Sequence, residues 1–400
     1  MWGGHSCPPV KSDQDADRVA SAHVGGQECP PHTLWSLGTF AKRMITVFTP
    51  SFADESNTNA QNLTVKEVVA RLDPSRFRVV LLGLGRSDPR IAARPNTRIL
   101  RWRKRGNTAR ILWHMLFHIP DVYFFPREGP LDAAFLAARA QLHWKSALAT
   151  YVVSGGLDQD TNRPILRRAI RECDIVAGNS RHMAETVERL GGRNVQTVYD
   201  GIDRRYYYPP PEPRHEGSPP SVLFAASFRH YKRADLVIRE AAKHPQWEFR
   251  LAGTGEEENA CQRLAQDLNC RNVVFLGHLT GAQVGAEMRR ASLFLFPSEI
   301  EGHPQVLGQA AACGLPCVAR SSYRPDYVID GVTGLLVSSD DRMSEALSRL
   351  IQEPDLRTRM SAAAIRHAAT FDWDRVTEQW QELLELAVAV HNTPRGKRIS

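Results

Sequence analysis

The sequence predicts an α/β protein with two doubly wound domains, each built on a parallel sheet. From residue 44 onward, short apolar runs typical of buried strands alternate with segments that carry apolar residues at helical spacing. A segment with six Pro, residues 206–220, interrupts this alternation and indicates a linker. A second alternating series follows it. Two such series separated by a linker predict two sheets of the βαβ kind.

The first series comprises six strands and five helices. We expect strands at 44–48, 77–84, 122–125, 150–153, 175–178 and 195–199, and helices at 60–72, 108–118, 131–142, 163–172 and 181–190. The second series has expected strands at 222–226, 248–252, 273–276 and 293–296, and helices at 234–243, 258–268, 281–291 and 306–313. A last helical pattern, 373–390, is expected to pack back on the first domain. The predicted divisions are a disordered tail at 1–43, domains at 44–205 and 221–370, the linker at 206–220, and the returning helix at 371–392.

Composition restricts the protein class. The 400 residues are 42% hydrophobic and 24% charged, which suits two domains with full cores. There is no run of eighteen apolar residues, and the N-terminus lacks the order of a signal peptide, so we expect a cytoplasmic protein. Seven Cys without zinc-ribbon spacing favour small buried thiols. Two D-x-D sequences, at 158–160 and 372–374, do not follow strands, so no metal site is expected.

The net charge of +7 is unevenly distributed. Residues 89–120 contain no Asp or Glu but carry eight cations together with Trp102, Trp113 and Phe117. One interpretation is a solvated basic face over core aromatics. The other is a surface, Arg90–Arg110, that binds anionic lipid headgroups or a phosphorylated acceptor. No nucleic-acid-binding module accompanies the stretch, so nucleic acid is not expected as a partner.

The segment 294–316 is the most informative about function. A strand ends at Pro297, a polar loop with Glu301 follows, and a helix of small residues ends before Gly314. A helix N-terminus without bulky side chains offers unpaired N–H groups and a positive dipole end. The segment therefore predicts a site for an anion such as a diphosphate that carries a sugar.

Two further loops of the second domain carry residues that suit such a ligand. Arg229 and Lys232 lie three apart just after a strand, where two cations could clamp a diphosphate, although a surface loop with ordinary charges is the alternative. The turn Gly253-Thr-Gly255 allows close backbone approach to a ligand.

In the first domain, the loop 50–62 is rich in hydrogen-bonding side chains. Its candidates for binding acceptor hydroxyls are Asp54, Asn57, Asn59 and Gln61. The alternative is that these residues cap the following helix.

Six segments, in register, resemble the retaining glycosyltransferases of family 4, the glycosyl transferases group 1. They are DGID at 200–203, SFRHYKRAD at 227–235, LAGTGEE at 251–257, FLGHL at 275–279, EGHPQVLGQAAACGLP at 301–316 and DGVTGLLV at 330–337. The similarity is good over about residues 195–340. It implies the GT-B fold, in which two Rossmann-like domains face a cleft, with a nucleotide-diphosphate sugar as co-substrate and no resident cofactor.

The resemblance also implies roles for residues. Glu301 would bond donor-sugar hydroxyls, and the backbone near Gly302, His303, Pro304, Val306 and Leu307 would meet the sugar and diphosphate. Gln309 stands where the family has the acid that binds ribose. His303 could reach the sugar or be structural. Family members often carry a His near the reacting carbon, at the end of a middle strand of the first domain. The matching place in this sequence is Ser154-Gly155-Gly156, so that His is absent, and Arg127 and Glu128 are candidate substitutes.

The resemblance implies transfer of a hexosyl group to an acceptor hydroxyl with retention of configuration, with Glu301, Arg229 and Lys232 in the catalytic positions. The acceptor could be a glycan, a lipid-linked molecule or a small molecule, and the protein could be peripheral to the membrane. Two alternatives stay open: a GT-B epimerase or phosphorylase, and a weakly catalytic or non-catalytic sugar-nucleotide-binding protein. A nicotinamide-binding dehydrogenase is disfavoured because neither G-x-G continues to a third Gly.

Overall fold

The computed structural model describes residues 43–54, 60–103, 105–125, 130–153, 164–211 and 220–393. Nearly all of the tail expected at 1–43 lies outside these ranges, and so do residues 212–219 of the expected linker. All elements below belong to the unit that begins at Met44.

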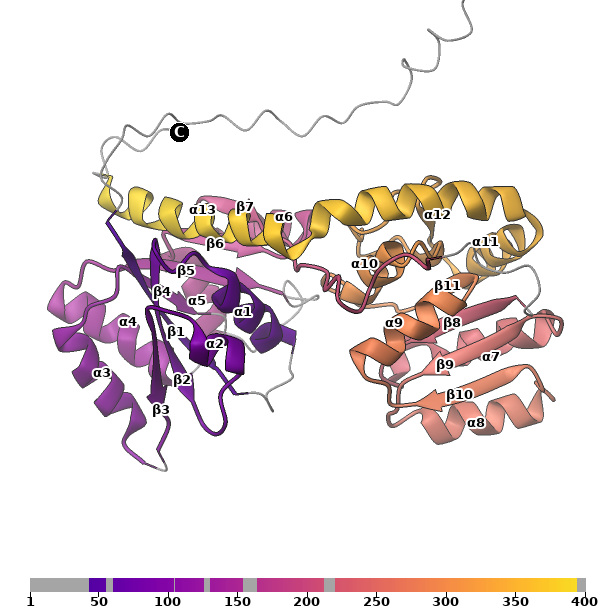
Figure 1. The fold of residues 1–400 in the computed structure, drawn as a ribbon, viewed down its shortest axis with the longest axis horizontal. Coiled ribbons are helices and arrows are strands. Elements are labelled where there is room, and N and C mark those ends of the chain that lie inside the picture. Colours follow the sequence, from indigo (N-terminus) through magenta and orange to yellow (C-terminus); the bar gives the residue numbers. More distant parts are fainter. Residues whose placement is uncertain are drawn as a thin grey trace, which may run out of the picture. The chain divides into compact units, whose positions relative to one another are not determined.

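The first half of this unit contains a parallel seven-stranded sheet, drawn in indigo to magenta in Figure 1. The strand order is β3-β2-β1-β4-β5-β6-β7. The strands are β1 (Ile45–Phe52), β2 (Phe77–Gly83), β3 (Thr97–Arg101), β4 (Val122–Phe125), β5 (Ala147–Val152), β6 (Ile175–Gly178) and β7 (Val195–Thr197). The helices are α1 (Ala60–Arg71), α2 (Pro89–Ala93), α3 (Asn107–Phe117), α4 (Pro130–Leu142), α5 (Pro164–Glu172) and α6 (Arg181–Arg189).

Both faces of this sheet are covered by helices, because successive strand residues point to opposite faces. Along β1, Val47 joins a core cluster with residues of α1 and of the last helix. Its neighbour Phe48 joins a second cluster with α3 and α4. This is the doubly wound arrangement that the sequence predicts.

The second half contains a parallel six-stranded sheet in the order β10-β9-β8-β11-β12-β13. The strands are β8 (Ser221–Ala225), β9 (Glu248–Ala252), β10 (Val273–Gly277), β11 (Leu293–Phe296), β12 (Cys317–Arg320) and β13 (Gly334–Val337). The helices are α7 (Ala234–Lys243), α8 (Glu258–Asp267), α9 (Gly281–Arg290), α10 (Gln305–Ala312), α11 (Asp340–Gln352) and α12 (Pro354–Ala368), with 3-10 turns η1 (His230–Lys232) and η2 (Ala369–Phe371). Leu223 and Phe224 of β8 again join different core clusters.

In each sheet the strand order reverses direction beside the first strand, at β1/β4 and at β8/β11. Open α/β sheets bind ligands outside the carboxyl ends of their strands at such a switch point. In the second sheet, the loops after β8 and β11 are the segments 226–233 and 297–304. The topology therefore brings Lys232 and Glu301 to one edge of the sheet.

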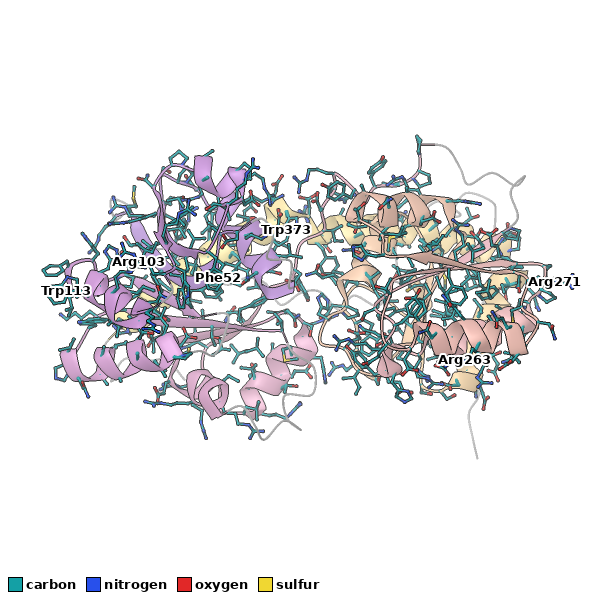
Figure 2. All side chains as sticks on the ribbon, turned by 90° about the horizontal axis from the view of Figure 1, so that it is seen from below. Phe52, Arg103, Trp113, Arg263, Arg271 and Trp373 are labelled. Atoms are coloured by element: carbon teal, nitrogen blue, oxygen red, sulfur yellow. The ribbon has the colours of Figure 1, made fainter. Side chains whose placement is uncertain are left out.

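The last helix, α13 (Trp373–Asn392), belongs to the core of the first sheet. Trp380, Leu383 and Leu384 are buried there among residues of β1, β2, β4 and β5. Trp373, labelled in Figure 2, is the first residue of this helix.

The structure adds elements that the sequence pattern did not predict. Within the basic stretch lie α2 and the edge strand β3, in which the exposed Arg98 and Arg101 alternate with less exposed residues. The elements β12, β13, α11 and α12 were not predicted either, although β13 lies within the motif at 330–337. No helix among the described residues is long and apolar enough to cross a membrane.

Candidate functional site

A pocket of about 360 Å³ lies where the loops after β8 and β11 meet the start of α10. Thr64 of α1, Val153 and Asn179 contribute from the first half, and Asp200 comes from the segment that follows β7. The second half contributes the remaining lining: Ala225, Ala226, Ser227, Lys232, Phe296, Glu301, Gly302, His303, Pro304, Gln305 and Val306. The residues that line the pocket therefore come from distant parts of the sequence, from Thr64 in α1 to Val306 in α10.

The N-terminus of α10 faces this pocket. Its N-cap is Pro304, and no side chain accepts a hydrogen bond there. The N–H of Leu307 already donates to the carbonyl of Pro304 at 3.0 Å, but the cap leaves the end free of acidic side chains. Since a helix N-terminus carries partial positive charge, this end of the pocket suits an anionic group.

Lys232 and Glu301 form an ion pair in the pocket wall, and each side chain is mostly buried, with exposures of 15% and 12%. Ser298 donates a hydrogen bond to Glu301 Oε1 at 2.5 Å, which fixes the carboxylate. The Lys232 ammonium also lies 5.2 Å from the ring centroid of Tyr231 and 5.5 Å from that of Phe296. A mostly buried cation and a mostly buried acid are therefore held side by side in the pocket wall.

Asp200 lines the pocket although the sequence did not predict it as a site residue. Its carboxylate is buried, and Oδ1 accepts hydrogen bonds from Thr64 Oγ1 at 2.6 Å and Tyr151 OH at 2.8 Å. Asn179 and Gln305 also hydrogen-bond this carboxylate, yet burial raises its pKa above the ordinary value. The available hint was in the DGID segment, where Asp stands in the place of the family's Asn.

His303 is buried beneath the loop, with 6% of its surface exposed. Neither ring nitrogen has a hydrogen-bond partner, and burial lowers its pKa to about 3. The ring stacks on Tyr327 with centroids 3.9 Å apart, and the Tyr327 hydroxyl donates to the Asp200 carbonyl at 2.8 Å. A neutral imidazole with unpaired nitrogens in a pocket wall can donate to and accept from a ligand hydroxyl.

Several predicted donor residues lie elsewhere. Arg229 is exposed at the start of η1 and does not line the pocket, so the predicted two-cation clamp is represented there by Lys232 alone among the described residues. Leu307 is buried in the core of the second sheet. Gln309 is half-buried, one turn further along α10 than Gln305, and does not line the pocket.

The Gly253–Gly255 turn has a structural role, since its backbone packs closely against the loop after β8. Gly253 has φ of +134°, and a Cβ there would lie 1.9 Å from the carbonyl oxygen of Ala226. Only Gly permits this approach between the loops after β8 and β9. The turn therefore shapes the loop that carries Lys232, and neither Gly lines the pocket.

The acceptor-side candidates separate into two groups. Asp54 is buried and accepts hydrogen bonds from the backbone of Leu84 and Gly85, which ties the loops after β1 and β2 together. The others lie outside the described residues, or in the case of Gln61 have an undescribed side chain: Asn57, Asn59, Gln61, Arg127, Glu128 and Ser154. Asp372 of the second D-x-D caps α13 by accepting from Asp374 N at 3.0 Å, and the first D-x-D is also outside the described part.

Comparison with known proteins places this site in context. Residues 210–367 match the family model "Glycosyl transferases group 1". D-inositol 3-phosphate glycosyltransferases from Mycobacterium tuberculosis and Mycobacterium bovis are 29% identical over 283 residues, which is 64% of this chain and 59% of theirs. The chain thus spans about three fifths of the length of these curated relatives.

Solved structures resemble the fold at low sequence identity. Sucrose-phosphate synthase from Thermosynechococcus elongatus superposes with a TM-score of 0.71 at 16% identity, covering 87% of this chain and 100% of that one. HepE from Anabaena in complex with UDP gives 0.70 at 17% identity, covering 86% and 100%. The predicted two-domain fold is confirmed: the protein has the GT-B fold, and its residues 210–367 are similar to the glycosyl transferases group 1.

Proposed function

We propose that the protein transfers a hexosyl group from a nucleotide-diphosphate sugar to an acceptor hydroxyl, with retention of anomeric configuration and without a metal ion or resident cofactor. The observation that carries this proposal is the Lys232–Glu301 pair beside the uncapped N-terminus of α10, in one pocket. Anion-binding and hydroxyl-binding groups lie together there, as a sugar diphosphate requires. The curated relatives are also named as glycosyltransferases.

In this proposal the α10 N-terminus receives the diphosphate, and Lys232 stabilises the negative charge that grows on it as the bond to the sugar breaks. Glu301 accepts hydrogen bonds from sugar hydroxyls. The departing phosphate oxygen takes the proton of the acceptor hydroxyl, whose oxygen forms the new bond on the same face of the sugar. The protein supplies positioning and charge stabilisation, and domain closure excludes water.

A uridine diphosphate sugar is the first donor to test. HepE, with the same fold, has been solved with UDP and with UDP-glucose. The inositol phosphate glycosyltransferases make a phosphorylated polyol a reasonable first acceptor, alongside glycans and lipid-linked acceptors. A cytoplasmic location, peripheral to the membrane, remains part of the proposal.

The test combines binding with product analysis. Uridine, guanosine and adenosine diphosphate sugars are compared by thermal shift, since a ligand that binds the folded state raises the melting temperature. Lys232→Ala and Glu301→Ala should each lower turnover at least about 10²-fold. Lys145→Ala, which removes an exposed lysine just before β5 that does not line the pocket, is the matched control and should leave turnover unchanged.

Product analysis distinguishes the rival functions. An epimerase would release an altered sugar or free nucleotide without an acceptor, and a phosphorylase would require inorganic phosphate. A non-catalytic binder would show the thermal shift with no product under any condition. Turnover near wild type in both pocket variants would show that the site is wrongly placed.

A further inference from the structure

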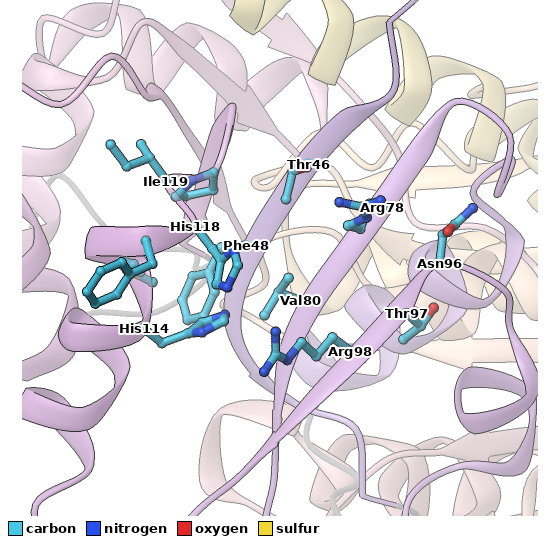
Figure 3. Close-up of a pocket in the computed structure, with 13 residues that line it drawn as sticks. Thr46, Phe48, Arg78, Val80, Asn96, Thr97, Arg98, His114, His118 and Ile119 are labelled. Carbon is cyan, nitrogen blue, oxygen red and sulfur yellow. The ribbon is translucent and has the colours of Figure 1, made fainter.

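A second cavity, of about 470 Å³, lies on the first sheet, far along its strands from the carboxyl ends that bear the candidate site. It is lined by the early residues of β1, β2 and β3 and by the C-terminal end of α3 (Figure 3). Thr46, Arg78 and Thr97 come from the first two residues of their strands. The cavity is therefore separate from the proposed donor site.

The charged groups of this cavity are cationic. Figure 3 shows Arg78 and Arg98 on neighbouring strands opposite His114 of α3 and His118, the residue that caps this helix. Within the described residues neither arginine side chain has a hydrogen bond or ion pair in the structure, and both are exposed. No acid is among the residues that line the cavity, and Asp121, next to the lining residue Pro120, accepts a hydrogen bond from Thr46 N at 2.8 Å.

Two arginines of the basic stretch at 89–120 are bound within the protein and do not belong to this surface. Arg90 is paired with Glu67 and Asp88, and Arg94 is buried against the carbonyls of Leu72 and Phe77. These two arginines stabilise the fold and are not available as a binding surface. Of the same stretch, Arg98 lines the cavity, beside Arg78 of β2.

An exposed apolar stripe borders the same cavity. Trp113, Leu116 and Phe117 of α3 are 64%, 43% and 69% exposed, and Ile119 just beyond the helix is 46% exposed. The Trp113 and Phe117 rings contact each other with centroids 5.6 Å apart, and Trp113 projects from the surface in Figure 2. On the opposite side of α3, Ile111 and Met115 are buried in the core. Apolar side chains therefore lie on the solvent side of the helix as well, where packing in the core does not account for them.

We propose that this surface docks the protein on an anionic phospholipid bilayer, with a lipid phosphate held in the cavity by Arg78 and Arg98. Trp113 and Phe117 would then lie at the level where headgroups meet acyl chains, the depth that aromatic side chains favour. A soluble phosphorylated molecule would account for the arginines but not for the adjoining apolar stripe. An anionic bilayer matches both, because it offers negative phosphates above an apolar layer.

Sedimentation of the full chain with vesicles tests the proposal. Vesicles of equal phosphatidylglycerol and phosphatidylcholine should bind the protein, and vesicles of phosphatidylcholine alone should bind it at least about 10-fold more weakly. The paired variant Arg78→Ser/Arg98→Ser should lower the partition coefficient about 30-fold, since each basic residue near an anionic surface contributes about a fivefold factor. Trp113→Ser/Phe117→Ser should lower it by about 10-fold or more even at low salt.

Matched controls come from α8 and the loop that follows it, in the second half of the chain. Arg263→Ser/Arg271→Ser removes two exposed arginines that are labelled in Figure 2, and Leu268→Ser removes one exposed apolar side chain. Both should bind vesicles as wild type does. Because all the substituted side chains are exposed, an unchanged melting temperature verifies that each variant is folded.

Two outcomes would overturn the proposal. The first is binding to anionic vesicles that the cavity and stripe variants do not weaken beyond the controls. The second is absence of vesicle binding while millimolar glycerol 3-phosphate protects the wild type thermally and not Arg78→Ser/Arg98→Ser, which would make the cavity a site for a soluble phosphate. The docking surface deepens the peripheral location named in the proposed function. Neither result depends on sugar transfer, so the docking surface and the transfer reaction can fail independently.

Discussion

Asp200 shows how one side chain joins elements that are distant in the sequence. Its Oδ1 accepts from Thr64 of α1 and Tyr151 of β5, and its carbonyl accepts from Tyr327. The carboxylate is buried, and desolvation raises its pKa despite these hydrogen bonds. The charged form of this carboxyl group is therefore costly to bury.

This arrangement predicts different outcomes for two substitutions of Asp200. Asp200→Ala should lower stability by about 2–4 kcal/mol, because two buried hydroxyls lose their acceptor. Asp200→Asn keeps the acceptor oxygen and removes the buried charge, so it should be at least as stable as wild type at pH 7. A raised folded-state pKa makes wild-type stability fall as pH rises, so the advantage of Asn should shrink as pH is lowered. Chemical denaturation at pH 7 and pH 5 measures both effects; equal losses in the two variants would contradict the account.

His303 predicts a second pH effect, of opposite sign. Burial lowers its pKa to about 3 in the folded protein, against 6.5 ordinarily. The unfolded chain therefore binds the proton first, and the stability present above about pH 6.5 is lost as pH falls, by about 1.4 kcal/mol per pH unit. His303→Phe, which can still stack on Tyr327, should lose about 2 kcal/mol less than wild type between pH 7.5 and pH 5.

Denaturation curves of wild type and His303→Phe at the two pH values give this difference. The exposed His278→Phe is the control and should follow wild type. If the His303 variant also follows wild type, the imidazole is not held neutral by burial.

At the scale of elements, α10 and the strand before it could be predicted from the sequence because their signals are local. Pro297 ends an apolar run, and small residues with a closing Gly delimit the helix. Helix α10 begins at Gln305, one residue before the predicted start. By contrast, Thr64, Asn179 and Asp200 lie on separate elements, and no local pattern indicates that they meet. The edge strand β3 was missed because its alternating arginines resemble a solvated loop.

The small residues of α10 also determine what packs against it. A Cβ on Gly308 would lie 2.7 Å from ring atoms of Tyr327, the side chain on which His303 stacks. In an open helix, Gly→Ala raises stability by about 0.5–1 kcal/mol. Gly308→Ala should instead lower stability and weaken donor binding, because the Tyr327 ring must move.

A double-mutant cycle tests this contact. Tyr327→Leu removes the ring, so Gly308→Ala should cost less stability in that background than in wild type. Melting temperatures of the four proteins give the coupling. A gain in stability from Gly308→Ala alone would show that the helix is not held against the ring.

At the scale of the whole molecule, the chain's last helix completes the core of the sheet formed by its first half. Trp373 of α13 packs so closely on Gly201 that a Cβ there would lie 2.3 Å from the indole. Trp380 is 1% exposed, and its ring contacts Phe124 of β4 and Tyr151 of β5. Tyr151 in turn donates to Asp200 in the candidate pocket. The helical pattern at 373–390 predicts the helix itself, whereas its place in this core and its link to the pocket depend on tertiary contacts.

Trp380 should therefore influence both the stability of the first domain and the pocket. Trp380→Ala leaves a large cavity beside Tyr151 and should cost about 3–5 kcal/mol of unfolding free energy, whereas Trp380→Phe should cost markedly less. Hydrogen exchange should quicken in β4 and β5, and donor affinity should fall because Tyr151 no longer holds Asp200 in place. The exposed Leu386→Ala, on the same helix, is the matched control and should change neither. Faster exchange confined to α13, with β4 and β5 unchanged, would contradict the view that this helix is part of the first domain's core.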